Sequence, residues 1–417
     1  MTVPQVTGPL GERPAPDAPA APLAGVRVLE VANMIAAPSM AALMADLGAS
    51  VVKVEPLTGD ILRNAVIDGP GPDPYFELDN RGKRGIAVDL STAEGIALVH
   101  RLAQSADVLV TNLTADRMAK YRLSADDVAT VAPRCIHASL SGYGTTGEDA
   151  GRLAYDMTAF FARGGVQSLV SEPDGAPPAF RPGQGDHTSA LALLAATLAA
   201  LRLRDTTGHV APVEVALMQV ATWTIASDLS VTLVSGTGPQ RWPREEWPSP
   251  LTCRFRCADD LWIAFCMPGP RDFWEAFARC VDRPEWVDDP RFATPIARRA
   301  NAADLIAACD DIFATRSRDH WSARLDAAGL TWGPIQTVES LVDDPTLHEL
   351  GGLHLIDDHP SGPFHTVAAP FHLRGADVTV RGRAPELGEH TRAVLAEAGL
   401  TETEIEELVE ARVVGTL

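Results

Sequence analysis

The 417-residue sequence lacks any uncharged apolar run of the roughly 18–20 residues that a transmembrane helix requires. Its longest apolar stretch, Ala190 to Leu201, stops at Arg202. Basic side chains are also few, because 35 Lys and Arg face 55 Asp and Glu, and no basic tract offsets the net charge of −20. We therefore expect neither a membrane nor a nucleic acid as partner, whereas a small polyanionic ligand could still bind in a local pocket of cations and N–H groups.

Cysteine is scarce, with six residues in the whole chain. The one close pair, Cys253 and Cys257, has no second pair or nearby His, so we predict no metal site there. So few cysteines in so long a chain favour reduced thiols and a cytoplasmic location. Residues 1–24 are rich in Pro and Ala and lack the basic and apolar regions of a signal peptide, so we predict a disordered lead-in.

From Gly25 onward, short apolar strands alternate with helical patterns. Residues 25–32, 39–48 and 49–56 read as strand, helix and strand, which predicts a βαβ unit with parallel strands. The alternation continues to about residue 225, with one helical stretch expected near residues 116–130, and predicts an α/β domain over residues 25–225.

The pattern changes after residue 225. Residues 226–249 contain SGTGPQRWPREEWPSP and are predicted to be a linker, because Pro, Gly and Trp break every periodicity. Residues 250–335 begin with a hairpin pattern and continue with helical segments, which predicts a smaller α+β domain. Residues 336–417 are predicted to form a second linker and a C-terminal segment.

Asp186 directly precedes the longest apolar helix of the chain. It could be a helix N-cap, since Asp is favoured at that position. It could also be a nucleophile on an activated acyl group, because Gly185 permits close approach and a helix N-terminus favours the ionised carboxylate. Both roles remain open on the residues alone.

Three polar segments are weaker candidates. GYGTTG, residues 142–147, has no apolar helix opening on its last glycine, so we do not expect a nicotinamide cofactor. NRGKRG, residues 80–85, gathers three cations and reads as a solvated turn or a phosphate site. Asn112 and Arg117 follow a predicted strand, where ligands of parallel sheets bind.

Taken together, these segments resemble the class III CoA-transferases, the CaiB/BaiF type that includes formyl-CoA:oxalate and carnitine CoA-transferases. The resemblance covers Gly25 to Val414 and is carried by the order of GVRVLEVANMIAAPSMAALMADLGASVVKVEP, NRGKRGIAVDL, ADVLVTN, SLSGYGTTG and GDHTSALALLAATLAALRLRDTTG. It implies a Rossmann-like large domain and a smaller α+β domain, with the C-terminal segment returning to the large domain. It also implies a homodimer of two interlocked rings.

The resemblance further implies that Asp186 attacks an acyl-CoA thioester and that a carboxylic acid is the acceptor. Coenzyme A enters as the substrate thioester, and no metal or redox cofactor is required. The CoA contacts that it implies are Ile35, Ala36, Val88, Asp89, Leu90, Ser91, Asn112, Leu113, Arg117, Met118, Leu153, Ala154, Tyr155 and Asp156.

Several positions depart from the family pattern. Ile35 replaces a polar residue, and Pro56 stands where a cation often follows the second strand, with Arg63 as a candidate substitute. Residues 235–243, SGTGPQRWP, are a poor copy of the glycine-rich run that closes over the site in formyl-CoA transferase. Ile35 and the apolar AFFARGG of residues 159–165 favour an acyl group larger or less polar than formate.

Two alternatives stay open. An α-methylacyl-CoA racemase relative would move a proton between a His and an Asp, but the corresponding pair here is Tyr155 and Asp156. Tyrosine is a poor base at neutral pH. An acyl-CoA-binding protein without turnover is the second alternative.

Overall fold

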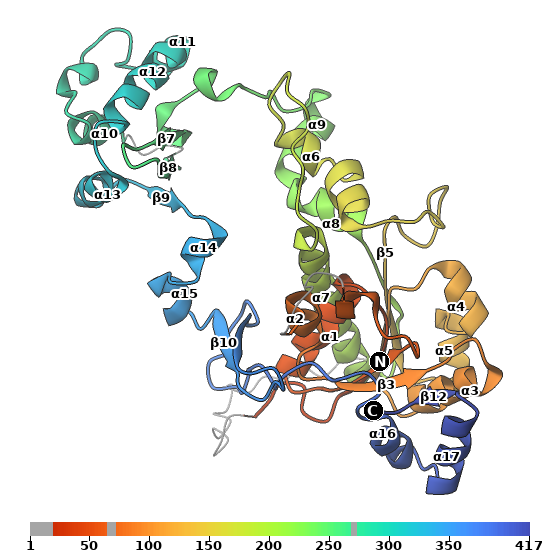
Figure 1. Ribbon diagram of the computed structural model, residues 1–417. Helices are drawn as coiled ribbons and strands as arrows, with labels where there is room; N and C mark the ends of the chain where they lie inside the picture. Colours follow the sequence, from red (N-terminus) through yellow and green to blue (C-terminus); the bar gives the residue numbers. More distant parts are fainter. Residues whose placement is uncertain (1–19, 65–71, 268–272) are drawn as a thin grey trace, which may run out of the picture. The chain divides into compact units, whose positions relative to one another are not determined.

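The computed structural model describes residues 20–64, 72–267 and 273–417 (Figure 1). The chain divides into two compact units. Unit 1 contains the described residues up to Val166, together with Phe180–Ala226 and Leu350–Leu417. Unit 2 contains Gln167–Ala179 and Ser227–Glu349.

Unit 1 is built on a seven-stranded sheet in the order β12-β3-β2-β1-β4-β5-β6. Strands β1 to β6 pair in parallel, and β12 pairs antiparallel with β3. The strands are β1 Arg27–Val31, β2 Ser50–Glu55, β3 Arg84–Val88, β4 Val108–Thr111, β5 Ile136–Ser141, β6 Val213–Ala216 and β12 Val414–Gly415. Helices cover both faces, which explains why these strands read as continuous apolar runs. The predicted α/β class with a parallel sheet is confirmed.

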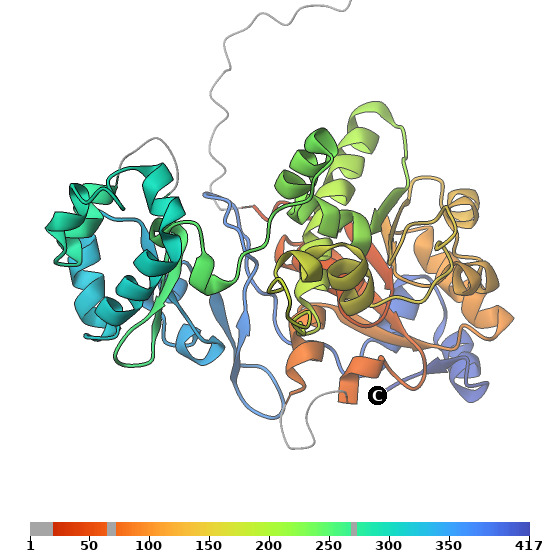
Figure 2. The same cartoon turned by 90° about the horizontal axis from the view of Figure 1, so that it is seen from above.

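The helices of unit 1 form two layers around this sheet (Figures 1 and 2). One apolar core joins the sheet to α1, η2, α7 and α8, and a second joins it to α3, α5, α16 and α17. The helices are α1 Ala36–Asp46, η1 Ile61–Asn64, α2 Pro74–Asn80, α3 Ala93–Ala103, α4 Ala115–Tyr121, α5 Ala125–Val131, the π-helix η2 Met157–Arg163, α7 Gln184–Thr207, α8 Leu217–Thr224, α16 Thr391–Glu397 and α17 Glu402–Glu410. A small antiparallel pair, β10 Leu353–Ile356 and β11 Phe364–Val367, completes the unit.

Helix α1 is buried along its whole length, which its small residues permit. Alanines and Ser39 let it lie closely between the sheet and α7. Residues 32–35 connect β1 to α1. The start of α7 lies beside this connection, as Ile35 Cδ1 is 3.7 Å from the position that a Cβ would take on Gly183.

Unit 2 has a three-stranded antiparallel sheet, β7-β8-β9, around an aromatic core. The turn after β7 carries Asp260 at φ 64°. Its strands are β7 Arg254–Arg256, β8 Trp262–Phe265 and β9 Trp332–Ile335. The helices are α9 Ala226–Ser235, η3 Arg244–Glu246, η4 Pro250–Thr252, α10 Trp274–Cys280, η5 Pro284–Val287, α11 Pro295–Ala300, α12 Ala302–Phe313, α13 Arg318–Ala327, α14 Val338–Leu341 and α15 Pro345–Glu349, while α6 Val166–Leu169 begins at the last residue of a unit 1 segment.

Three segments differ from the sequence-based expectation. Residues 20–24 are packed and not a free lead-in, since Leu23 is buried and its N–H donates to the Leu47 carbonyl at 2.8 Å. Residues 1–19 lie outside the described residues. The predicted linker 226–249 contains α9, and the helical stretch predicted at 116–130 is split into α4 and α5 by the left-handed Arg122.

Within the described ranges, no single helix is long and apolar enough to cross a membrane. Among the described residues, Leu217–Thr224 and Ala226–Ser235 meet the length and composition of a span when taken together, but they are bent by 79° at the break.

Candidate active site

The carboxyl ends of the parallel strands bring most of the predicted ligand contacts to one edge of the sheet. Loops there follow β1, β3, β4 and β5 and carry Ile35, Asp89, Asn112 and Ala154 among others. The edge has a switch point between β1 and β4, because β1 is flanked by β2 on one side and by β4 on the other. Ligands of open α/β sheets bind at such a point.

Asp186 is the third residue of α7, which begins at Gln184. Gly183 is the N-cap, with φ 98°, so the prediction that Asp186 might cap the helix is wrong. Glycine suits this left-handed position, which a side chain would strain. The side chain of Asp186 is half-buried, while Gly185 and Ser189 on either side of it are buried. A carboxylate in the first turn of a long helix is therefore left accessible to a ligand.

Burial raises the pKa of Asp186 to about 7, and the nearby carboxylate of Asp156 adds to this rise. The charge of His187 acts in the opposite direction, and that of Asp79 raises the value further. The expectation that Asp186 stays ionised at the helix N-terminus therefore does not hold near neutral pH, because desolvation and like charge oppose the helix dipole. At neutral pH the group lies close to its titration midpoint, so its ionised and protonated forms are both populated.

The carboxylate of Asp156 holds the segment that opens α7. Asp156 Oδ2 accepts hydrogen bonds from the backbone N–H groups of Gly183 at 2.8 Å and Gly185 at 3.3 Å. The residue is 1 % exposed. A Cβ on Gly185 would lie 2.7 Å from Cγ of Phe160 and 2.9 Å from Cβ of Asp156, so this close packing requires glycine. Asp156, predicted as a CoA contact, is thus buried and holds the backbone that leads into Asp186.

His187 is bound to a buried carboxylate on the other side of Asp186. Its Nε2 lies 3.1 Å from Oδ1 of Asp79, and Ser39 Oγ donates to the same oxygen at 2.6 Å. The side chain of Asp79 is 1 % exposed and that of His187 is 41 % exposed. Although burial lowers the pKa of His187, the hydrogen bond and charge of Asp79 raise it above the ordinary value. Asp79 therefore shifts the imidazole of His187 toward its protonated form.

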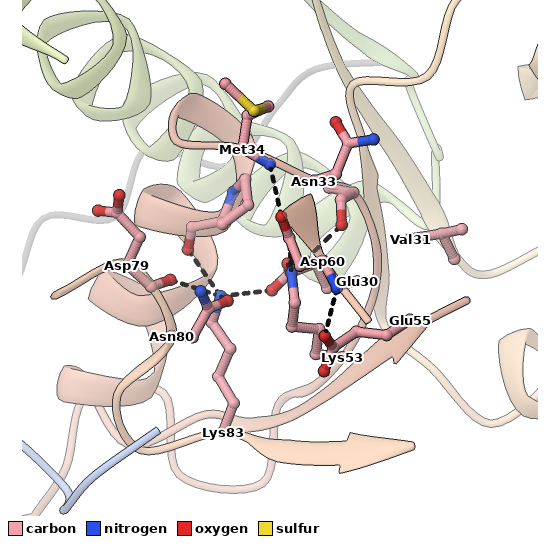
Figure 3. A network of polar contacts seen from close by, with 12 residues as sticks. Glu30, Val31, Asn33, Met34, Lys53, Glu55, Asp60, Asp79, Asn80 and Lys83 are labelled. Carbon is pink, nitrogen blue, oxygen red and sulfur yellow. Dashed lines mark hydrogen bonds and ion pairs between the residues drawn. The ribbon is translucent and has the colours of Figure 1, made fainter. Parts of the chain in front are cut away.

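A buried ion network holds the loop after β1 (Figure 3). Lys53 Nζ lies 2.9 Å from both Glu30 Oε1 and Asp60 Oδ2, and Asp60 Oδ1 accepts the N–H of Met34 at 3.4 Å. Met34 has φ 63°, a left-handed conformation that costs a residue with a side chain about 1–2 kcal/mol. The network therefore holds a strained residue at the switch point, and such strain is concentrated at functional sites.

The cations of NRGKRG are paired within the chain. Arg81 binds Asp46 at 2.7 Å, Lys83 binds Glu30 at 2.5 Å, and Arg84 binds Glu397 at 2.7 Å. Arg81 and Lys83 are also buried, at 3 % exposure each. The segment is thus neither the solvated turn nor the phosphate site that the sequence allowed, and it belongs to the packing under the site.

The remaining predicted residues fall into two groups. Ile35, Ala36 and Val88 are buried, and Asn112 uses both ends of its amide on the backbone of Asn33, at 3.1 and 2.6 Å. The other group is exposed or half-buried at the same edge of the sheet and consists of Asp89, Leu90, Ser91, Leu113, Arg117, Met118, Leu153, Ala154 and Tyr155.

The two cations predicted near the ligand, Arg63 and Arg117, differ in whether they are already paired. Arg63, the candidate substitute for the cation missing at Pro56, binds Glu55 at 2.6 Å and lies over the ring of Phe76. Arg117 is exposed on α4 and has no side-chain partner within the described part of the chain. Arg117 is therefore the freer of the two to meet an anionic ligand.

Sequence reasoning missed Asp79, Ser39, Lys53 and Asp60. The sequence does indicate a role for Lys53, because a cation inside the apolar strand SVVKVE must find a buried partner. It does not indicate a role for Asp79, since the partner of Asp79, His187, is 108 residues away in the chain. Among the described residues, no group of three or more His, Cys, Asp or Glu side chains is placed to hold a metal ion.

The chain is similar to known proteins over most of its length. The family model described as CoA-transferase family III matches residues 23–391. The (R)-2-hydroxy-4-methylpentanoate CoA-transferase of Clostridioides difficile is 30% identical over 397 residues, which cover 94% of this chain and 99% of that protein. The cinnamoyl-CoA:phenyllactate CoA-transferase of Clostridium sporogenes is 30% identical over 393 residues, covering 92% and 95%. The crystal structure of a CaiB/BaiF family protein from Brucella suis superimposes with a TM-score of 0.81 at 31% identity, covering 91% of this chain and 100% of that one.

Proposed function

Because the chain belongs to CoA-transferase family III, we propose that it moves coenzyme A from an acyl-CoA donor to a carboxylic acid through a covalent intermediate at Asp186. The observation that carries this proposal is the accessible carboxylate of Asp186 in the first turn of α7, beside the strand ends that bind ligands in such sheets. The relatives named above are CoA-transferases, which supports this chemistry over that of a racemase.

The proposed cycle requires only the acyl-CoA donor and the acceptor acid as reactants. Asp186 attacks the thioester carbonyl, the C–S bond breaks, and the products are a mixed anhydride and CoA thiolate. The thiolate then attacks the Asp186 carbonyl and releases the donor acid, leaving an aspartyl-CoA thioester. The acceptor carboxylate reverses these two steps, so that Asp186 is regenerated and the acceptor leaves as its CoA thioester.

The backbone N–H groups of Ala36 and Ala37 at the start of α1 are the candidate donors to the oxyanions of these steps. Helix α1 has neither a side-chain cap nor an acidic residue in its first turn within the described chain. Its N-terminal N–H groups therefore lack the acceptor that a capping side chain supplies. Such donors stabilise the negative charge that develops on an attacked carbonyl.

We further propose that the acyl group and the acceptor are apolar carboxylic acids larger than formate. Ile35 is buried beside the Asp186 segment, where a polar residue would favour small polar acids. The two relatives named above act on acids with a branched or an aromatic side chain, by their names. A higher kcat/KM with formyl-CoA and oxalate than with branched or aromatic acyl-CoA would contradict this choice.

The test of the covalent step is mass spectrometry after incubation with branched, aromatic and short acyl-CoA thioesters and quenching with hydroxylamine. We expect a hydroxamate on the peptide that carries Asp186, and its loss in Asp186→Asn. Asp205→Asn, an exposed carboxylate on the same helix, is the matched control and should retain the adduct. Deuterium uptake at the α-carbon without CoA transfer would instead indicate racemase chemistry.

We also propose a homodimer that works without a metal or redox cofactor, as the family resemblance implies. Light scattering coupled to gel filtration measures the dimer. Transfer activity that is unchanged after dialysis against a chelator is the result expected for a metal-independent enzyme.

A further inference from the structure

We propose that His187, fixed by Asp79, is a positioning residue whose positive charge favours the ionised form of Asp186 that attacks the thioester. The inference rests on the proposed covalent function, and it adds a specific residue to it. It is drawn from the chain of contacts Ser39–Asp79–His187, which joins α1, α2 and α7 directly beside the nucleophile.

The buried carboxylate of Asp79 forms its salt bridge, among the described residues, with His187. The carboxylate of Asp79 is 1 % exposed, and its Oδ2 has no hydrogen-bond partner among the described residues. An unpaired buried carboxylate is costly, so a positive charge nearby is strongly favoured. Of the other nearby cations, Arg81 binds Asp46 and its charge lowers the pKa of His187. Lys83 binds Glu30 and the backbone carbonyl of Asp79, and it interacts with the Asp79 carboxylate by charge alone.

Asp186 has carboxylates on two sides. Asp156 lies before η2 and Asp79 lies on α2, and both raise the pKa of Asp186, whereas His187 lowers it. Loss of the His187 charge would leave Asp186 among negative groups only, so that its protonated and unreactive form would dominate to higher pH.

His187 acts through space in this arrangement. Adjacent residues of a helix point in different directions, so adjacency in the chain does not bring the His187 ring into contact with the Asp186 carboxylate. The ring instead turns toward Asp79, with Cε1 3.5 Å and Nδ1 3.7 Å from the position that a Cβ would take on Gly183. Its side chain remains 41 % exposed, which lets it exchange a proton with solvent.

The experiment measures single-turnover acylation of Asp186 from pH 5.5 to 9.5 by hydroxylamine trapping. His187→Gln keeps an N–H donor for Asp79 but removes the charge. We expect its acidic limb to move upward by about one pH unit, with acylation slowed about 10-fold at pH 6 and within about twofold of wild type at pH 9. Thr188→Val, the next residue on α7, should keep the wild-type limb.

Equal slowing at every pH would indicate a purely structural role for His187 and overturn the inference, as would an unmoved limb. A separate readout does not require turnover, namely the titration of the His187 ring by NMR. Asp79→Asn and Asp186→Asn should each lower the pKa of His187, because both carboxylates raise it. If wild type never forms an adduct at Asp186 while these shifts appear, the covalent function fails and the charge coupling stands.

Discussion

The carboxylate of Asp156 accepts a 2.8 Å hydrogen bond from the backbone N–H of Gly183, 27 residues later in the chain. This contact fixes the first turn of α7 against the start of η2, and Gly185 donates to the same oxygen. Asp156 thereby sets the position of Asp186 through the backbone and its ionisation through charge. The same buried carboxylate thus fixes the backbone beside Asp186 and raises the pKa of Asp186.

Asp156→Asn separates these two roles. The Asn carbonyl oxygen still accepts from Gly183, but the negative charge that raises the pKa of Asp186 is gone. We expect the acidic limb of acylation to move below pH 7, opposite in direction to His187→Gln. The pH profile of hydroxylamine-trapped acylation measures this shift. Asp149→Asn, a part-exposed carboxylate that pairs with Arg163, is the control. A limb that rises would mean that Asp156 does not act on Asp186 by charge.

Asp186→Asn should stabilise the fold at neutral and alkaline pH. Burial raises the pKa of Asp186 from 3.8 to about 7, so the native state holds this proton more tightly than the unfolded chain. Ionisation of Asp186 therefore costs native stability as pH rises from about 4, and the cost is complete above about pH 7. The full shift corresponds to about 4 kcal/mol, which partial exposure reduces to about 1–3 kcal/mol.

Urea unfolding of both proteins at pH 4 and pH 8 measures this difference. The free energies of unfolding should differ least at pH 4, where Asp186 is protonated in the native state and about half protonated in the unfolded chain, and diverge in favour of Asn at pH 8. A difference independent of pH would assign the effect to packing, and greater stability of the wild type at pH 8 would contradict the raised pKa.

The elements of unit 1 could be predicted from sequence because each is encoded locally. β1, α1 and β2 follow from apolar periodicity with a Gly48 stop, and Asp186 stands out because an apolar helix follows it. The site's charge balance could not be predicted, since Asp79 and His187 meet only after α2 and α7 pack. The same limit applies to NRGKRG, where Arg81 and Lys83 look solvated in sequence but are buried against Asp46 and Glu30.

Lys53→Met tests the buried ion network. The substitution leaves the carboxylates of Glu30 and Asp60 without the ammonium that lies 2.9 Å from each. We expect a loss of about 3–5 kcal/mol in the free energy of unfolding, measured in urea, because breaking a buried pair strands a charge. Lys120→Met, on the exposed surface of α4, is the matched control and should change stability by about 0.5 kcal/mol or less. Equal effects of the two variants would show that the network does not hold the loop of Met34.

Arg117→Ala tests whether the carboxyl edge of the sheet binds coenzyme A. Arg117 is exposed, and its guanidinium has no side-chain partner within the described chain, so removal costs little stability. We expect the Kd for CoA, measured by calorimetry, to rise about 3- to 10-fold in low salt, because a cation near the phosphates or adenine is lost. The difference from wild type should shrink in about 0.5 M salt, where exposed charges are screened.

Arg202→Ala, an exposed cation near the far end of α7, should leave the Kd unchanged. Equal weakening by both variants would point to general charge attraction and not to a site at the end of β4.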